Sequence, residues 1–302
     1  MFPNWLLPAL ASAAIIGAVG VVDSHFIIRR MPSLRAYLLI VGVATLVMSA
    51  VLLAAFPFPA GPPWQALGAS VGAAVIRTAA VITMLYVLQK EDVARVIPLG
   101  ATAPVFVAVL AFAFLGERLS ALQWGAVLLA VGGAVLISFK RDGGVSRFES
   151  RSFFLMLFSS LLFAASDVTS KFAMTHLSFW NNAAISFFVT AVIIILSCLR
   201  APVVREIRGI RHRWRTALAA GFNQLMAIAA MVMAFSAIQQ GPVSLVSSVM
   251  STRPLFVFVY ALTLGYLWPG FLMAAPRDGK SLAIKLTATL MIITAMAVIS
   301  LS

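Results

Sequence analysis

The feature that most constrains this chain is a series of ten apolar segments, each about as long as a bilayer core is thick. A helix needs roughly 20 apolar residues to cross a membrane. The segments span residues 5–28, 36–56, 64–89, 92–115, 119–139, 152–174, 178–199, 214–239, 242–264 and 285–301. The first lacks the basic start of a signal peptide and stays apolar too long, so we interpret it as a spanning helix. The sequence therefore predicts an all-α integral membrane protein with ten transmembrane helices.

Composition supports this class and excludes others. The chain has 302 residues, of which 62% are hydrophobic and 10% charged, and no gap between segments is long enough for a soluble domain. We therefore expect no catalytic domain outside the bilayer. The net charge of +13 does not indicate a nucleic-acid partner, because the basic residues lie in short gaps where they act as topology signals. The single cysteine, Cys198, excludes a disulfide framework, and we expect neither a cofactor nor a metal site.

An internal repeat divides the chain. Residues 85–115 align with residues 235–265 at a constant offset of 150. The matched pairs include Gln89 with Gln239, Thr102 with Thr252, and Pro104 with Pro254. Because each copy has five helices, an odd number, the second copy enters the membrane with the opposite orientation. We predict two inverted five-helix repeats, residues 1–140 and 150–302.

The segment 96–137 resembles the helix 4, "GER" loop and helix 5 region of EamA-type proteins of the drug/metabolite transporter (DMT) superfamily. The stretch "VSLVSSVMSTRPLFVFVY" is similar to the counterpart in the second half of that family. The resemblance implies a ten-helix basket with the fifth and tenth helices to one side, and export or exchange of small polar metabolites. The second copy departs from the pattern, because Gly265-Tyr266-Leu267 stands where the first has Gly116-Glu117-Arg118. A role for the Glu-Arg pair in capping helix ends therefore stays open.

Four charged residues stand out because they lie well inside the predicted spans: Arg77 and Arg253 halfway along theirs, and Asp23 and Asp167 in the last third of theirs. A charge at the centre of a span costs at least roughly 2.5 kcal/mol on insertion scales, so each needs a physical reason. One interpretation is that each arginine pairs with an aspartate or with helix carbonyls and fixes the packing. The other is that the guanidinium groups face a cavity and bind a carboxylate or phosphate.

Proline and polar residues gather near Arg253. Pro254 and its repeat partner Pro104 each remove a helical hydrogen bond, and we predict that they are hinges, although simple packing kinks explain them equally well. Ser251 and Thr252 precede Arg253, and Asn223 and Gln224 lie midway along the neighbouring predicted helix. Convergent donors of this kind suit a polar solute. The predicted substrate-binding residues are Arg77, Asn223, Gln224, Ser251, Thr252 and Arg253.

Three residues are candidates for proton coupling: Asp23, His25 and Asp167. A carboxylate in a medium of low dielectric constant favours its protonated form and titrates nearer neutral pH. The alternative is that each carboxylate lies near a helix end and pairs with Lys171 or a loop arginine.

The sequence predicts a secondary active transporter, an exporter, of a small polar metabolite such as an amino acid or another solute bearing a carboxylate or phosphate, working by alternating access. Its expected partners are this solute and the lipid bilayer, and the sequence leaves open whether the chain acts as a homodimer. One alternative is a non-transporting assembly subunit. Another is an intramembrane aspartyl enzyme, against which the inverted repeat argues by placing the two aspartates toward opposite membrane faces.

Basic residues also predict the orientation. Of the 22 Lys and Arg residues, 18 lie in or at the edges of the gaps that a ten-helix topology places on the face opposite the termini. Short basic loops stay in the cytoplasm. We therefore predict a multi-pass protein of the cell (inner) membrane with both termini outside the cytoplasm, although members of the superfamily commonly keep their termini inside.

Overall fold

The secondary structure consists of helices, without strands, wherever the computed structural model describes the chain: residues 3–29, 31–59, 61–88, 100–138, 150–210, 213–267 and 279–301. The helices are α1 (Leu6–Arg29), α2 (Leu34–Ala55), α3 (Trp64–Leu88), α5 (Ala103–Leu115), α6 (Ala121–Ser138), α7 (Ser150–Ala173), α8 (Phe179–Cys198), α9 (Ala201–Arg208), α10 (Arg213–Gln240), α11 (Val243–Met250), α12 (Arg253–Leu267) and α13 (Gly279–Leu301). The predicted all-α class is confirmed.

Six of these helices, α1, α2, α3, α7, α8 and α10, are long and apolar enough to cross a membrane. Shorter apolar helices fall within the other four predicted spans. Large apolar side chains cover the outside of the bundle: Phe114 and Leu196 are each 75% exposed, and Leu290 is 65% exposed. Such side chains are costly in water but stable against lipid tails. The chain is a multi-pass membrane protein.

The span predicted over residues 242–264 is divided into two helices, α11 and α12. Ser251 and Thr252 form the turn between the two helices. Their hydroxyls donate to carbonyl oxygens in the last turn of α11, each at 2.7 Å. Pro254 follows, and it has no N–H with which to continue the helical hydrogen bonds. The interruption therefore has a local cause in the sequence.

A matching turn precedes α5. Thr102 stands before the first residue of α5, and Pro104 lies in the first helical turn. The N–H of Val105 donates to the carbonyl of Thr102 at 3.1 Å, and the N–H of Leu255 donates to that of Thr252 at 2.9 Å. Thr102 aligns with Thr252, and Val105 aligns with Leu255, at the offset of 150 residues. The same hydrogen bond therefore occurs at matching positions of the two repeats. The two proline-containing turns thus share a local geometry.

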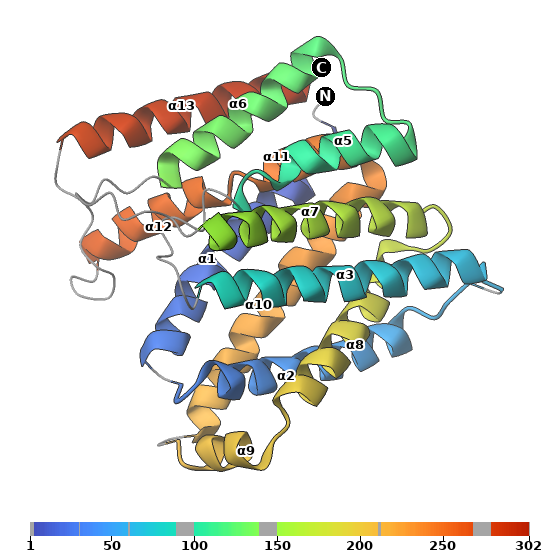
Figure 1. Cartoon of the computed structure of the whole chain (residues 1–302), viewed down its shortest axis with the longest axis vertical. Helices are drawn as coiled ribbons and strands as arrows, with labels where there is room; N and C mark the ends of the chain where they lie inside the picture. Colours follow the sequence, from blue (N-terminus) through green and yellow to red (C-terminus); the bar gives the residue numbers. More distant parts are fainter. Residues whose placement is uncertain are drawn as a thin grey trace.

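Helices of the first and second predicted repeats pack against one another in pairs. The most extensive packing joins α3 with α7, α1 with α10, α2 with α8, and α6 with α13. Figure 1 shows α6 and α13 side by side, apart from the bundle that contains α2, α3, α7 and α8. The main apolar core draws residues from both parts of the chain, and its largest fully buried side chain is Phe235 of α10.

Close packing of α6 on α13 depends on a glycine. A Cβ at Gly133 would lie 2.9 Å from the carbonyl oxygen of Ala288 and 2.8 Å from Cγ1 of Ile292. Because no side chain fits at that distance, glycine lets the two helix backbones approach. This contact fixes the pair that stands apart from the bundle.

Candidate substrate-binding site

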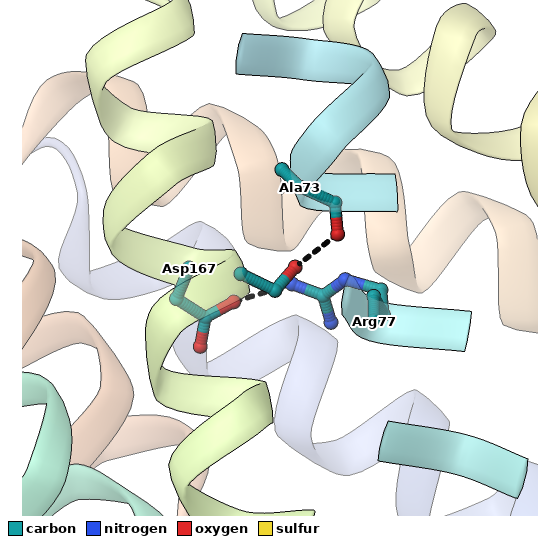
Figure 2. Close-up of polar contacts among 4 residues, drawn as sticks. Ala73, Arg77 and Asp167 are labelled. Carbon is teal, nitrogen blue, oxygen red and sulfur yellow. Dashed lines mark hydrogen bonds and ion pairs between the residues drawn. The ribbon is translucent and has the colours of Figure 1, made fainter. Parts of the chain in front are cut away.

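An ion pair joins α3 to α7 inside the membrane-spanning region. Nη2 of Arg77 donates to Oδ1 of Asp167. Figure 2 shows the guanidinium of Arg77 reaching across from α3 to the carboxylate on α7. Ser166 donates its hydroxyl to the carbonyl of Ala73 at 2.9 Å and so holds the same two helices together beside the pair. The interpretation that Arg77 pairs with an aspartate is confirmed.

The pair is not sealed from its surroundings. The side chains of Arg77 and Asp167 keep 17% and 19% exposure. A fully buried pair offers nothing to a solute, whereas a partly exposed guanidinium retains free N–H donors, since it has five in all. The ion pair and a role in binding are therefore compatible.

Phe235 of α10 lies under the guanidinium and was not predicted. The Cζ atom of Arg77 is 5.6 Å from the centroid of the Phe235 ring, and Phe235 is fully buried. At this distance the face of the ring attracts the cation. No sequence signal separates Phe235 from the other residues among the chain's 22 phenylalanines, because its role depends on how α10 packs against α3.

Arg253 begins α12, directly after the turn at Ser251 and Thr252. Its Nε atom is buried and has no hydrogen-bond partner among the residues that the structure describes. Its charge is attracted by Asp167 and repelled by Arg77. Two arginines therefore act on one carboxylate, and the group as a whole carries an excess positive charge.

The hydroxyls of Ser251 and Thr252 are already engaged as donors. Both donate to carbonyls of α11, and Thr252 is almost fully buried. Their oxygens keep lone pairs for accepting a hydrogen bond. Pro254 and Pro104, the predicted hinges, each lie in the first turn of the helix that follows a break.

Asp23 belongs to a second network. Its Oδ1 atom accepts hydrogen bonds from the hydroxyl of Tyr37 and from Nδ2 of Asn223, the latter at 2.5 Å. Within the described residues, Asp23 has no ion-pair partner. The side chain of His25, the third coupling candidate, lies outside the part of the chain that the structure describes.

In the described part of the chain, Asn223 and Gln224 form no hydrogen bond with the arginine group. Asn223 bonds to Asp23, and Nε2 of Gln224 donates to Oγ1 of Thr45 at 3.0 Å. These bonds tie α10 to α1 and α2. The expectation that both residues converge with Arg253 rested on sequence position along a helix, which does not specify the direction of a side chain.

Lys171 is not the partner of Asp167, so that alternative is wrong. Instead, Nζ of Lys171 donates to three backbone carbonyls at the end of α10. Asp167 lies one helical turn earlier on α7 and faces α3, where Arg77 meets it. Because Asp23 and Asp167 have different partners, they do not form the shared pair that an aspartyl enzyme needs.

Comparison with known families is consistent with this geometry. Residues 3–139, which make up the first predicted repeat, match the family model of the EamA-like transporter family. The predicted resemblance to EamA-type transporters of the drug/metabolite transporter superfamily is thereby confirmed for the first half of the chain. No curated protein matches the chain in sequence.

Solved structures match the fold as well. A crystal structure of another protein superposes with a TM-score of 0.72 and covers 99% of this chain and 96% of its own. The two sequences are 19% identical. The likeness therefore concerns the fold over nearly the whole chain, including the part beyond the family match.

Proposed function

We propose that this protein is a secondary active transporter that exports a small polar solute carrying a carboxylate or phosphate, by alternating access. The family match over residues 3–139 supports transport, and the resemblance of the helix 4 to helix 5 region supports export. The nature of the solute is argued from the charged groups in the spans. All of these groups come from one chain, so the proposed site needs no second copy.

The observation that carries the choice of solute is the charge imbalance among Arg77, Arg253 and Asp167. Asp167 compensates one guanidinium, which leaves the other with an unpartnered, buried Nε. An unpaired charge in a span is costly, and an incoming anion removes that cost. Arginine binds carboxylate and phosphate through two parallel hydrogen bonds, which gives such a site its preference for these anions.

Alternating access needs two equivalent halves, for which we propose residues 1–140 and 150–302 with five spans each. The helix packing supports this assignment. If α10 takes the place of α3 and α7 that of α1, the α3–α7 and α1–α10 pairs exchange, while α2–α8 and α6–α13 each map onto themselves. A two-fold axis in the membrane plane produces this pattern. The matching turns at Thr102 and Thr252 support it at the level of single bonds.

Coupling to protons is proposed for Asp23. Its partners, Tyr37 and Asn223, are neutral donors, whereas Asp167 is held by a cation. The ion pair commits the charge of Asp167 to Arg77. Asp167 therefore suits a structural and charge-balancing role, and Asp23 is the better candidate to gain and lose a proton.

A thermal-shift panel of amino acids, organic acids, sugar phosphates and amines on detergent-purified protein tests the solute class. A ligand that binds the folded state raises its melting temperature by mass action. We expect stabilisation by anionic or zwitterionic members and none by simple amines. Stabilisation by amines alone would contradict the proposal.

Arg253→Gln tests the site itself. We expect the variant to insert and fold but to lose both ligand-dependent stabilisation and transport in proteoliposomes, because glutamine provides neither the charge nor the paired donors. Arg118→Gln is the matched control, since Arg118 is exposed in a loop. Normal transport by Arg253→Gln would show that Arg253 is structural. Failure of the unchanged protein to transport any solute of the panel would favour the assembly subunit.

A further inference from the structure

The turn between α10 and α11 lies on the face of the molecule that carries the N-terminus. A Cβ at Gly241 would come within 2.4 Å of Cγ of Trp5, which stands just before α1. Only glycine fits against the indole at this distance. The start of the first predicted repeat is therefore pressed against a turn of the second.

Glu117 reaches this turn from the loop between α5 and α6. Its Oε1 atom accepts a hydrogen bond from the N–H of Val243 at 2.8 Å, and its Oε2 atom accepts one from the N–H of Ser244 at 3.3 Å. The hydroxyl of Ser244 also donates to Oε2. A carboxylate at a helix N-terminus gains from the unpaired N–H groups and from the helix dipole. The capping role left open for Glu117 is confirmed, and the helix it caps belongs to the other repeat.

Lys171 binds the other side of the same turn. Its Nζ atom donates to the carbonyls of Ile238, Gln239 and Gly241 at 2.6, 3.0 and 2.8 Å. These carbonyls end α10, where the helix dipole favours a cation. The charges of Lys171 and Glu117 also attract each other. The turn is thus held by a cation at the end of one helix and an anion at the start of the next.

The sequence positions that correspond to Lys171 and Glu117 in the other repeat carry no charge. When Asp23 is aligned with Asp167, Ile27 stands where the second repeat has Lys171. Glu117 is matched by Leu267 at the offset of 150, and by Tyr266 when Gly265 is set against Gly116. None of these residues supplies a charge for a helix end, so the two faces of the proposed inverted repeat are not equivalent.

We propose that Glu117 and Lys171 form a latch that holds the transporter closed on the face that carries its termini. Glu117 joins the loop between α5 and α6 to the start of α11, which leads to the turn before Arg253. Movement of α11 away from this face must therefore break the hydrogen bonds of Glu117. This inference rests on the proposed alternating access, but it concerns which end state is favoured and not which solute is carried.

Cysteine accessibility tests the latch without any solute. In a Cys198→Ser background, Ser247→Cys places a single thiol on α11, where the native side chain is 8% exposed. A membrane-impermeant maleimide is then added to the face that carries the termini, in vesicles of that orientation. We expect slow labelling in this background and about tenfold faster labelling after Glu117→Gln or Lys171→Met, because either change removes charge-assisted hydrogen bonds. Ser244→Ala removes one bond, so its effect should be smaller.

Arg118→Gln is the control, since it changes the neighbouring charge without touching α11, and its labelling rate should equal that of the background. If Glu117→Gln fails to insert, Ser244→Ala still decides the question through its labelling rate. The latch would be overturned if folded Glu117→Gln and Lys171→Met proteins were labelled no faster than the background protein. It would also be overturned if the background protein itself were labelled fast. Faster labelling in a protein that binds no anion would preserve the latch and overturn the proposed solute.

Discussion

Asp23 and Asp167 show how one kind of residue acquires two roles. They align in the two repeats, and each is met by a side chain from a neighbouring helix. For Asp167 that side chain is the cation Arg77, whereas for Asp23 it is the neutral amide of Asn223. The two aspartates therefore differ in their partners. The partner decides whether the charge of the carboxylate is balanced by a cation.

Removing Asp167 should reveal the cost of an unpaired cation. Asp167→Asn leaves Arg77 without its partner, and we expect a loss of about 3 kcal/mol in the free energy of unfolding, the low end for a buried pair because both side chains keep some exposure. The double variant Arg77→Gln with Asp167→Asn should regain much of that loss. Unfolding in mixed detergent micelles measures both.

Ser166→Ala is the control for this cycle, because it removes the hydrogen bond to Ala73 beside the pair and leaves both charges in place. We expect a loss of about 1 kcal/mol, the net value of one hydrogen bond. If the double variant is as unstable as the sum of the single variants, the two charges are not coupled.

At the scale of elements, the break between α11 and α12 places a charged residue where a helix restarts. The turn at Ser251 and Thr252 sets the position of Arg253, and Pro254 prevents the two helices from joining. The corresponding break before α5 has no arginine, since Ala103 occupies that place. Both repeats therefore contain the proline-containing turn, but only the second carries an arginine there.

Replacing both Pro104 and Pro254 by alanine should slow transport more than it weakens binding. Each alanine restores an N–H that allows the helix to continue through the break, which stiffens the proposed hinge. Transport rates in proteoliposomes and ligand-dependent thermal shifts separate the two effects, with the solute that the panel identifies.

Pro8→Ala is the control, because Pro8 lies in the first turn of α1, where no break precedes it within the spanning segment. Its transport rate should be unchanged. An equal loss of binding and transport in the double variant would mean that the prolines shape the site and not the motion.

At the scale of the whole molecule, the charge distribution predicts how the protein sits in the membrane. Basic residues gather in the loops opposite the termini, including the segment around α9, where Arg200, Arg205 and Arg208 are exposed. These positions match the cytoplasmic side of a protein that follows the positive-inside rule. The latch of Glu117 and Lys171 would then lie on the outer face.

A reporter fused after Ser302 tests this orientation. We expect little signal from a reporter that is active only in the cytoplasm, and strong signal from one that is active only outside. A fusion within the segment 209–212 should give the reverse result and serves as the internal control. Strong cytoplasmic signal from the C-terminal fusion would reverse the predicted topology.

The sequence by itself determined the class of this protein and several local features. Hydrophobic length determines which segments enter the membrane, because each apolar residue contributes to insertion independently of its neighbours in space. Proline chemistry likewise determines where helices break, since a missing N–H acts within one turn. The family, the all-α class and the residues worth examining all followed from such local properties.

Only the tertiary structure decided the partners. Asp167 faces Arg77 and not Lys171, Asn223 meets Asp23, and Glu117 caps a helix 126 residues further along the chain. These contacts join helices that are distant in sequence, and each depends on how a helix is rotated about its axis when it packs. Apolar composition on every side of a spanning helix leaves that rotation unspecified, so packing against the neighbouring helices decides it.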